Sequence, residues 1–189
     1  MRIALLHTAA SNIAVFDAAA PPGVTLTHIL RPDLLAEAEA AGGATPEILA
    51  RTAAVVAAAA LTADAVLVTC TTLGAVGGPR LDAMLAEAVA ARGGGIVLCT
   101  APTTLAPTAA VMGAATRTRL IPGAWALFSA GNHAGYLAAI AAAADAAFDE
   151  DPVVALAQAS MAPAAALCTR GVPLTAPAVA LARMTGVTV

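Results

Sequence analysis

The chain has 189 residues, of which 60% are hydrophobic, 11% charged and 3% aromatic, with a formal net charge of −3. This apolar content excludes an intrinsically disordered protein. Much of it is alanine, however, and the most apolar run, Ala53 to Val68, is interrupted by Thr62 and Asp64, so we expect a soluble protein without a membrane span. A strand-like run follows Met1 at once and no signal-peptide pattern is present, so we expect a cytoplasmic location.

All nine basic residues are arginines, and the sequence contains no lysine. This composition excludes a Schiff-base lysine, covalently held pyridoxal phosphate and a Walker A loop. The arginines are scattered along the chain, so nucleic acid is not an expected partner. The three cysteines and three histidines are also dispersed, without a CxxC pair or metal-ligand spacing, and we expect neither a metal site nor a disulfide.

The hydrophobic pattern predicts strands and helices in alternation. In chain order we predict a strand over Arg2–Leu6, a strand over Val24–Leu30, a helix over Thr45–Ala63, a strand over Ala65–Val68, a helix over Pro79–Arg92, a strand over Ile96–Leu98, a helix over Pro107–Thr116, an apolar run of undetermined type at Trp125–Phe128, a helix over His133–Phe148, a strand over Val153–Leu156, a helix from about Ser160 and a short strand over Val172–Leu174. Thr45 is the expected N-cap of its helix, followed by Pro46 at the first helical position. The alternation and the continuously apolar strands are typical of an α/β protein with parallel sheets.

Two pairs of segments indicate an internal duplication. Ala4–Ala9 matches Ile96–Ala101, and Leu67–Leu73 matches Ala155–Met161, at similar offsets of 92 and 88 residues. Each segment is a strand followed by a short loop, and hydroxyl side chains recur in these loops. The duplication predicts two pseudo-symmetric lobes with parallel sheets flanked by helices, formed by residues 1–93 with 172–189 and by residues 94–171.

The duplicated loops predict one binding site. Ligands of parallel sheets bind at the carboxyl ends of the strands, so two facing half-sites would form one cleft. Cys70 would lie on one wall and Gln158 on the other.

Cys70 follows an apolar strand in the run Val68-Thr69-Cys70-Thr71-Thr72. A buried, inert cysteine that packs as a small hydrophobe is the common alternative. The neighbouring threonines, however, are good donors to a bound anion, and the amino terminus of a following helix would lower the pKa of the thiol. Such a thiol can move a proton at a carbon next to a carboxylate without a cofactor.

These motifs, in this order, resemble the aspartate/glutamate racemase superfamily, which includes hydantoin racemase, maleate isomerase and arylmalonate decarboxylase. The resemblance covers most of the chain and implies two pseudo-symmetric α/β lobes with the site between them. It implies a catalytic role for Cys70. Leu5-Leu6-His7-Thr8 and Thr100-Ala101-Pro102-Thr103-Thr104 are similar to the carboxylate-binding loops of the family. The substrate-binding residues expected from these loops and from the hydroxyl set are Thr8, Ser11, Thr71, Thr72, Thr100, Thr103, Thr104, Gln158 and Ser160, several of which can equally cap helices.

The sequence departs from the family at Gln158, which stands where the second catalytic cysteine is expected. An amide binds a carboxylate through hydrogen bonds but cannot serve as an acid or base. A second base would have to be another residue: His7 on the first loop, Cys99 or His133. We include His7 among the catalytic candidates, whereas Cys168 lies about ten residues beyond Gln158 and is expected to pack.

We therefore expect a cofactor-independent, racemase-like isomerase that acts on a small carboxylic acid, an amino acid or a dicarboxylate, through the single thiol of Cys70. The thiol could transfer a proton or add to an activated double bond. The alternatives are a lyase that decarboxylates malonate-like acids and a non-catalytic protein that binds a small carboxylate. We expect no cofactor, no nucleic-acid partner and no membrane partner, and the sequence leaves open a homo-oligomer.

Overall fold

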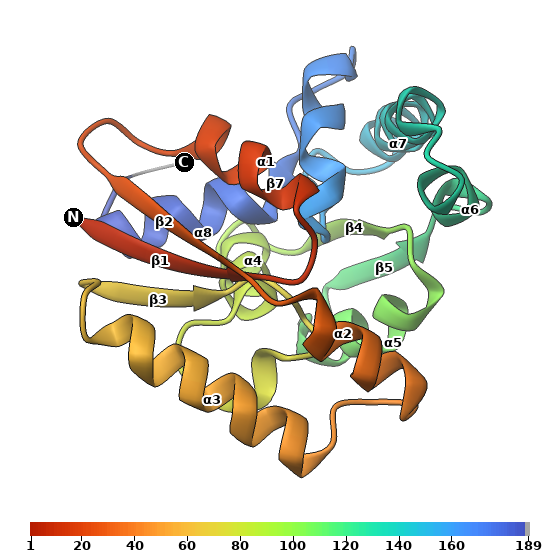
Figure 1. Cartoon of the computed structure of the whole chain (residues 1–189). Coiled ribbons are helices and arrows are strands. Elements are labelled where there is room, and N and C mark those ends of the chain that lie inside the picture. Colours follow the sequence, from red (N-terminus) through yellow and green to blue (C-terminus); the bar gives the residue numbers. More distant parts are fainter. Residues whose placement is uncertain (188–189) are drawn as a thin grey trace. The chain divides into compact units, whose positions relative to one another are not determined.

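The computed structural model describes residues 1–187 and divides the chain into two compact units (Figure 1). Unit 1 comprises Met1–Leu81 and the C-terminal residues from Ala180, and unit 2 comprises Asp82–Val179. No helix in the described part of the chain is both long and apolar enough to cross a membrane. Each unit is described by itself below.

Unit 1 is built on a parallel sheet with the strand order β2-β1-β3. Strand β1 (Arg2–His7) lies between β2 (Thr25–Leu30) and β3 (Ala65–Val68). Residues Ile3 to His7 of β1 are buried, as expected of a central parallel strand that is covered on both faces. The register pairs Leu6 with Val68, so β1 and β3 end at the same edge of the sheet.

Successive side chains of β1 point to opposite faces of the sheet, and each face is covered by helices. Leu6 packs with residues of α2 (Pro32–Ala40) and α3 (Pro46–Ala60), whereas the ring of His7 lies 5.3 Å from that of Phe16 in α1 (Ser11–Ala19). The predicted N-cap of α3 is confirmed, since Thr45 Oγ1 accepts a hydrogen bond from the Ile48 amide.

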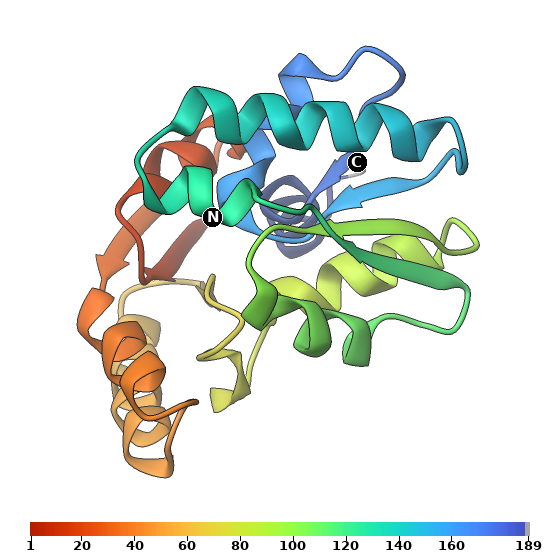
Figure 2. The same cartoon turned by 90° about the vertical axis from the view of Figure 1, so that its right-hand side faces the viewer.

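Unit 2 is built on a parallel sheet with the strand order β5-β4-β6-β7. The strands are β4 (Gly95–Cys99), β5 (Thr116–Leu120), β6 (Val154–Leu156) and β7 (Leu174–Thr175). The helices of this region are α4 (Leu81–Ala90), α5 (Pro102–Val111), α6 (Ala124–Ser129), α7 (His133–Phe148), the 3-10 helix η2 (Ala159–Leu167) and α8 (Ala176–Thr185). Helix α4 begins in unit 1 and α8 ends in it. Figure 2 shows α7 along one face of the sheet. Its buried stripe has helical spacing and consists of Tyr136, Ile140, Ala144 and Ala147.

The two sheets repeat one topology. The order β2-β1-β3 in unit 1 corresponds to β5-β4-β6 in unit 2, with a central first strand in each case. This correspondence pairs β1 with β4 and β3 with β6, the same strands that the sequence repeat matches. The predicted α/β class with duplicated parallel sheets is thus confirmed.

The structure corrects the prediction between residues 102 and 120. The helix expected over Pro107–Thr116 is α5, which begins at Pro102 and contains Pro107 within it. The following strand β5 was not predicted, because its sequence alternates threonine and arginine. It is an edge strand, and Arg119 pairs with Glu150 at its exposed side.

The boundaries of the two units also differ from the predicted ones. We predicted 1–93 with 172–189 for the first lobe, but β7 pairs with β6 and so belongs to the second sheet. Almost all of α4 likewise falls in unit 2. The segment after Gln158, predicted as an α-helix, is the 3-10 helix η2 with Pro163 inside it.

Candidate functional site

In unit 1 β1 and β3 end at the same edge of the sheet, where His7 is the last residue of β1, Thr8 follows it, and Thr69 and Cys70 follow β3. Thr69 makes two hydrogen bonds to β1, because both its amide nitrogen and its Oγ1 lie 3.0 Å from the carbonyl oxygen of Leu6. Cys70 is the next residue, so its position at the strand end depends on Thr69.

Cys70 is half-buried and packs against the core cluster that contains Val68 and Leu73. Our expectation of a helix amino terminus directly after it is wrong. The chain forms a turn and then a 3-10 helix of three residues, Gly74–Val76, and the next α-helix begins only at Leu81. A single 3-10 turn has little macrodipole, and the helix amino terminus that the sequence suggested is not next to Cys70.

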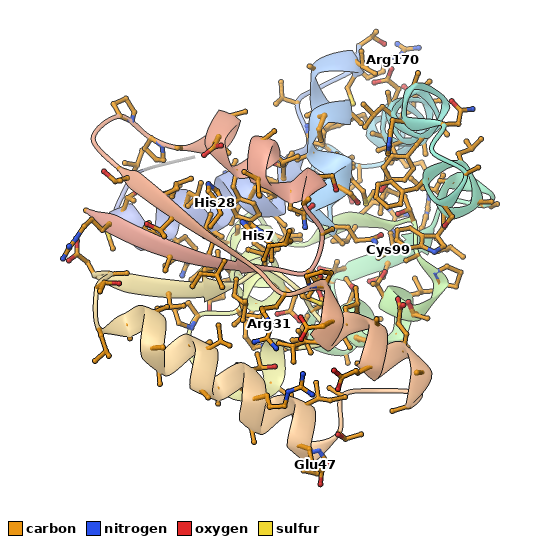
Figure 3. All side chains as sticks on the ribbon, viewed as in Figure 1. His7, His28, Arg31, Glu47, Cys99 and Arg170 are labelled. Carbon is orange, nitrogen blue, oxygen red and sulfur yellow. The ribbon has the colours of Figure 1, made fainter. Side chains whose placement is uncertain are left out.

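His7 is fully buried and both of its ring nitrogens have partners. Figure 3 labels His7 next to His28, one of these partners. His7 Nδ1 lies 2.9 Å from Thr69 Oγ1, and His7 Nε2 lies 2.9 Å from His28 Nδ1. The two rings are stacked, with centroids 5.1 Å apart. Burial, together with the neighbouring His28, lowers the pKa of His7 to about 4, so the ring is neutral at pH 7.

His28 extends this chain of contacts to the surface. His28 Nε2 lies 3.0 Å from Oδ1 of Asp17, whose side chain is 57% exposed. Hydrogen bonds therefore connect an exposed carboxylate on α1 with the buried hydroxyl of Thr69, through one histidine on β2 and one on β1. We call Asp17, His28, His7 and Thr69 the Asp17–Thr69 relay.

The remaining predicted residues of unit 1 differ in their exposure. Thr8 is buried and Thr71 half-buried, whereas Thr72 and Ser11 are exposed, with Ser11 at the start of α1. A residue that we did not predict, Asn12, carries a buried Oδ1 atom without a hydrogen-bond partner in the described part of the chain. Such a buried acceptor is costly and calls for an explanation.

In unit 2, Gln158 binds the loop after β4 (Gly95–Cys99). Its Oε1 accepts three hydrogen bonds, from the Thr100 amide at 2.7 Å, Thr100 Oγ1 at 2.8 Å and the Ala101 amide at 3.1 Å. Backbone amides only donate, so they determine which end of the Gln158 amide is the oxygen. We call these three groups the Thr100 donor set.

A chain of hydroxyl groups supports this donor set. Thr100 Oγ1 lies 3.1 Å from the Tyr136 hydroxyl, which lies 2.9 Å from Ser160 Oγ. Thr100 donates to Gln158, so it must accept from Tyr136, and Tyr136 in turn accepts from Ser160. Tyr136 was not predicted, because its spacing with Ile140 is that of an ordinary buried helix stripe.

Of the candidate second bases, Cys99 is fully buried, and this burial raises the pKa of its thiol. His133 is exposed at the start of α7, where its ring contacts Phe128. Cys168 packs partly against the core of unit 2, as expected.

The two threonines of the loop before α5 differ. Thr104 is half-buried and donates to the Ala101 carbonyl, which leaves its hydroxyl occupied within the loop, whereas Thr103 is exposed.

The structure thus brings together two sets of predicted residues, each within its own unit. Thr8, Cys70 and Thr71 lie on adjacent loops of unit 1 with His7, and Thr100, Gln158 and Ser160 lie together in unit 2. Residues 1–187 contain no group of three or more side chains suited to a metal ion. Whether Cys70 and Gln158 face each other depends on the arrangement of the two units and stays a prediction.

Comparisons with known proteins bear on the fold. No protein-family model and no curated protein matches the sequence. The structure is similar to allantoin racemase from Klebsiella pneumoniae, with a TM-score of 0.57 and 15% sequence identity, over 100% of this chain and 89% of that chain. The chain has a racemase-like α/β fold. At this sequence identity the likeness is one of fold.

Proposed function

We propose that this protein is a cofactor-independent isomerase of the racemase kind that acts on a small carboxylic acid through the thiol of Cys70. The observation that carries this proposal is the position of Cys70 at the carboxyl end of β3, half-exposed and next to the loop after β1. This edge is where parallel sheets bind their ligands. The racemase-like fold supports the same class of reaction.

With Cys70 as the reacting thiol, two kinds of reaction are possible: proton transfer and nucleophilic addition. A cysteine thiol is ionised to a few per cent at pH 7 even without activation, and the thiolate is a strong nucleophile. As a base, the Cys70 thiolate removes the proton from the carbon next to the carboxylate. Return of a proton by the same thiol to the same face only exchanges that proton, so racemisation requires a second proton donor on the opposite face or a carbanion that turns over before the Cys70 thiol reprotonates it. As a nucleophile, it forms an S–C bond to an activated double bond, which lets the former double bond rotate before the S–C bond breaks again.

The amide at position 158, where the family pattern would place a second thiol, favours chemistry with one thiol. In unit 1 the position that duplicates Gln158 is Cys70, and an amide cannot replace a thiol in proton transfer. The Gln158 oxygen is already occupied by the Thr100 donor set, so only its Nε2 remains to donate to a ligand.

The same observation favours decarboxylation as a second candidate. When a malonate-like acid loses carbon dioxide, the carbanion needs one proton, which the Cys70 thiol supplies and regains from water. If no acid is converted with Cys70 in place, the protein is one that only binds a small carboxylate.

The test compares Cys70→Ala with Cys168→Ala, because both replace a half-buried thiol. Conversion of amino acids, unsaturated dicarboxylates and substituted malonates is followed by chiral chromatography, and folding by circular dichroism. We expect Cys70→Ala to remain folded and lose conversion, and Cys168→Ala to retain both. Conversion by folded Cys70→Ala at the parent rate would overturn the proposal.

A further inference from the structure

We propose that Asp17 and His28 are positioning residues for Cys70, acting through His7 and Thr69. The inference rests on the proposed role of Cys70 as the reacting group. Neither residue was expected from the sequence. Four contacts of 2.9 to 3.0 Å form one continuous chain from the Asp17 carboxylate to the Leu6 carbonyl, which is hydrogen-bonded to Thr69, the residue before Cys70.

The direction of each hydrogen bond follows from what each group can donate. The Leu6 carbonyl only accepts, so the Thr69 hydroxyl gives its single proton to Leu6. Thr69 Oγ1 must then accept from His7, which requires the proton of His7 to lie on Nδ1.

The rest of the relay follows in the same way. His7 is buried and neutral, so its Nε2 carries no proton and accepts from His28 Nδ1. The Asp17 carboxylate accepts from His28 Nε2. The complete relay therefore contains a His7 ring with its proton on Nδ1 only.

This arrangement explains why a buried histidine ends the central strand of the unit 1 sheet. His7 holds the Thr69 hydroxyl in the orientation that binds Leu6, and Thr69 holds the strand end from which Cys70 emerges. The groups that contact His28 among the described charged and titratable residues are His7 and Asp17. Asp17 is exposed, so the relay connects the Cys70 loop to the solvent.

The first test is direct and independent of turnover. The protein has three histidines, so a sample labelled with 15N-histidine gives a simple spectrum of ring nitrogens. We expect His7 at neutral pH to show a protonated Nδ1 and a bare Nε2. The opposite tautomer at His7 would overturn the proposal.

The second test measures how fast iodoacetamide alkylates Cys70, resolved from the other thiols by peptide mass spectrometry. Thr69→Val removes the hydroxyl that ends the relay, whereas Thr69→Ser keeps it. Thr52→Val is the matched control, because Thr52 is also buried in unit 1 and its hydroxyl also donates to a backbone carbonyl, that of Ile48.

We expect Thr69→Val and His28→Phe to change the Cys70 alkylation rate and its pH profile, by on the order of ten-fold in rate, since small displacements of a reacting group have large effects. Thr69→Ser and Thr52→Val should retain the parent profile. If His28→Phe does not fold, Asp17→Asn at the exposed end tests the same link. Parent-like alkylation in both Thr69→Val and Asp17→Asn would overturn the inference.

The proposal and the proposed function fail in distinguishable ways. If the relay controls Cys70 alkylation but no acid is converted, the positioning role stands and the enzymatic function does not. If Cys70 is required for conversion but the relay variants react like the parent, only the positioning role is lost.

Discussion

The side-chain oxygen of Gln158 lies 2.7 Å from the amide nitrogen of Thr100, and it accepts two further hydrogen bonds from the same loop. Two backbone amides and a hydroxyl that converge on one oxygen form the kind of donor set that binds a carboxylate. In unit 2 the side-chain oxygen of Gln158 occupies the Thr100 donor set, in the place that a carboxylate oxygen of a ligand would take.

Replacing Gln158 tests this relationship. Gln158→Ala leaves the Thr100 donor set without an acceptor, which we expect to lower the free energy of unfolding by about 1 to 3 kcal/mol. Acetate should then bind the vacant donors and raise the melting temperature of this variant in a concentration-dependent manner. The parent, whose donors are occupied, serves as the control. An equal effect of acetate on both proteins would contradict this assignment.

Asn12 offers a test of a different kind, because its buried Oδ1 lacks a partner among the described residues. Replacing an unsatisfied polar group with an apolar one of similar size is neutral or stabilising. We expect Asn12→Leu to unfold at an equal or higher denaturant concentration than the parent. If Asn12 Oδ1 accepts an N–H group of the substrate, the same variant should bind substrate more weakly. Clear destabilisation by Asn12→Leu would show that the side chain has a structural role.

The start of β4 should tolerate glycine alone. A Cβ atom at Gly94 would lie 2.3 Å from the carbonyl oxygen of Ala115, and the residue has a φ of +105°. Gly93 has a similar φ of +91° but open space around it. We expect Gly93→Ala to lower the free energy of unfolding by about 1 to 3 kcal/mol, the typical cost of a strained backbone conformation. Gly94→Ala should cost more, since a backbone clash is added. Urea denaturation of both variants measures the difference, and equal losses would count against the clash.

The depressed pKa of His7 predicts a pH dependence of stability. Its folded pKa of about 4 lies below the usual value of 6.5, so the unfolded chain binds the proton more readily. Stability is therefore complete above about pH 6.5 and declines as the pH falls toward 4, by about 3 kcal/mol in total. Denaturant unfolding between pH 4.5 and 7 measures this slope, and His7→Gln should reduce it. A parent-like slope in His7→Gln would assign the effect to other groups.

The sequence predicted the parts of the fold that depend on local patterns. The boundaries of β3 and α7 match the prediction, because a continuous apolar run and a long alanine-rich segment leave few alternatives. Strand β5 was missed because an edge strand needs no apolar side chains, and Arg117 and Arg119 are stabilised there by acidic residues more than thirty positions away.

The sequence predicted which residues lie at the candidate site but not the hydrogen bonds that connect them. The hydroxyl-rich loops identified Cys70, Thr100 and Gln158, which the structure places at strand ends. The links from His7 to His28 and from Thr100 to Tyr136 join residues 21 and 36 positions apart. Such contacts arise from strand pairing and helix packing, which a single sequence does not specify.

The role of Cys70 is tested most directly by proton NMR in D₂O, with aspartate, glutamate, maleate and a substituted malonate as candidate substrates. Parent, Cys70→Ser and Cys168→Ser are compared at equal concentration, because serine keeps the size of cysteine but lacks its acidity. We predict that the parent and Cys168→Ser exchange the proton next to the carboxylate, or convert the acid, for at least one of these compounds, and that Cys70→Ser does neither. Exchange by Cys70→Ser at the parent rate, or no reaction of any of these acids with the parent, would contradict a catalytic thiol at Cys70.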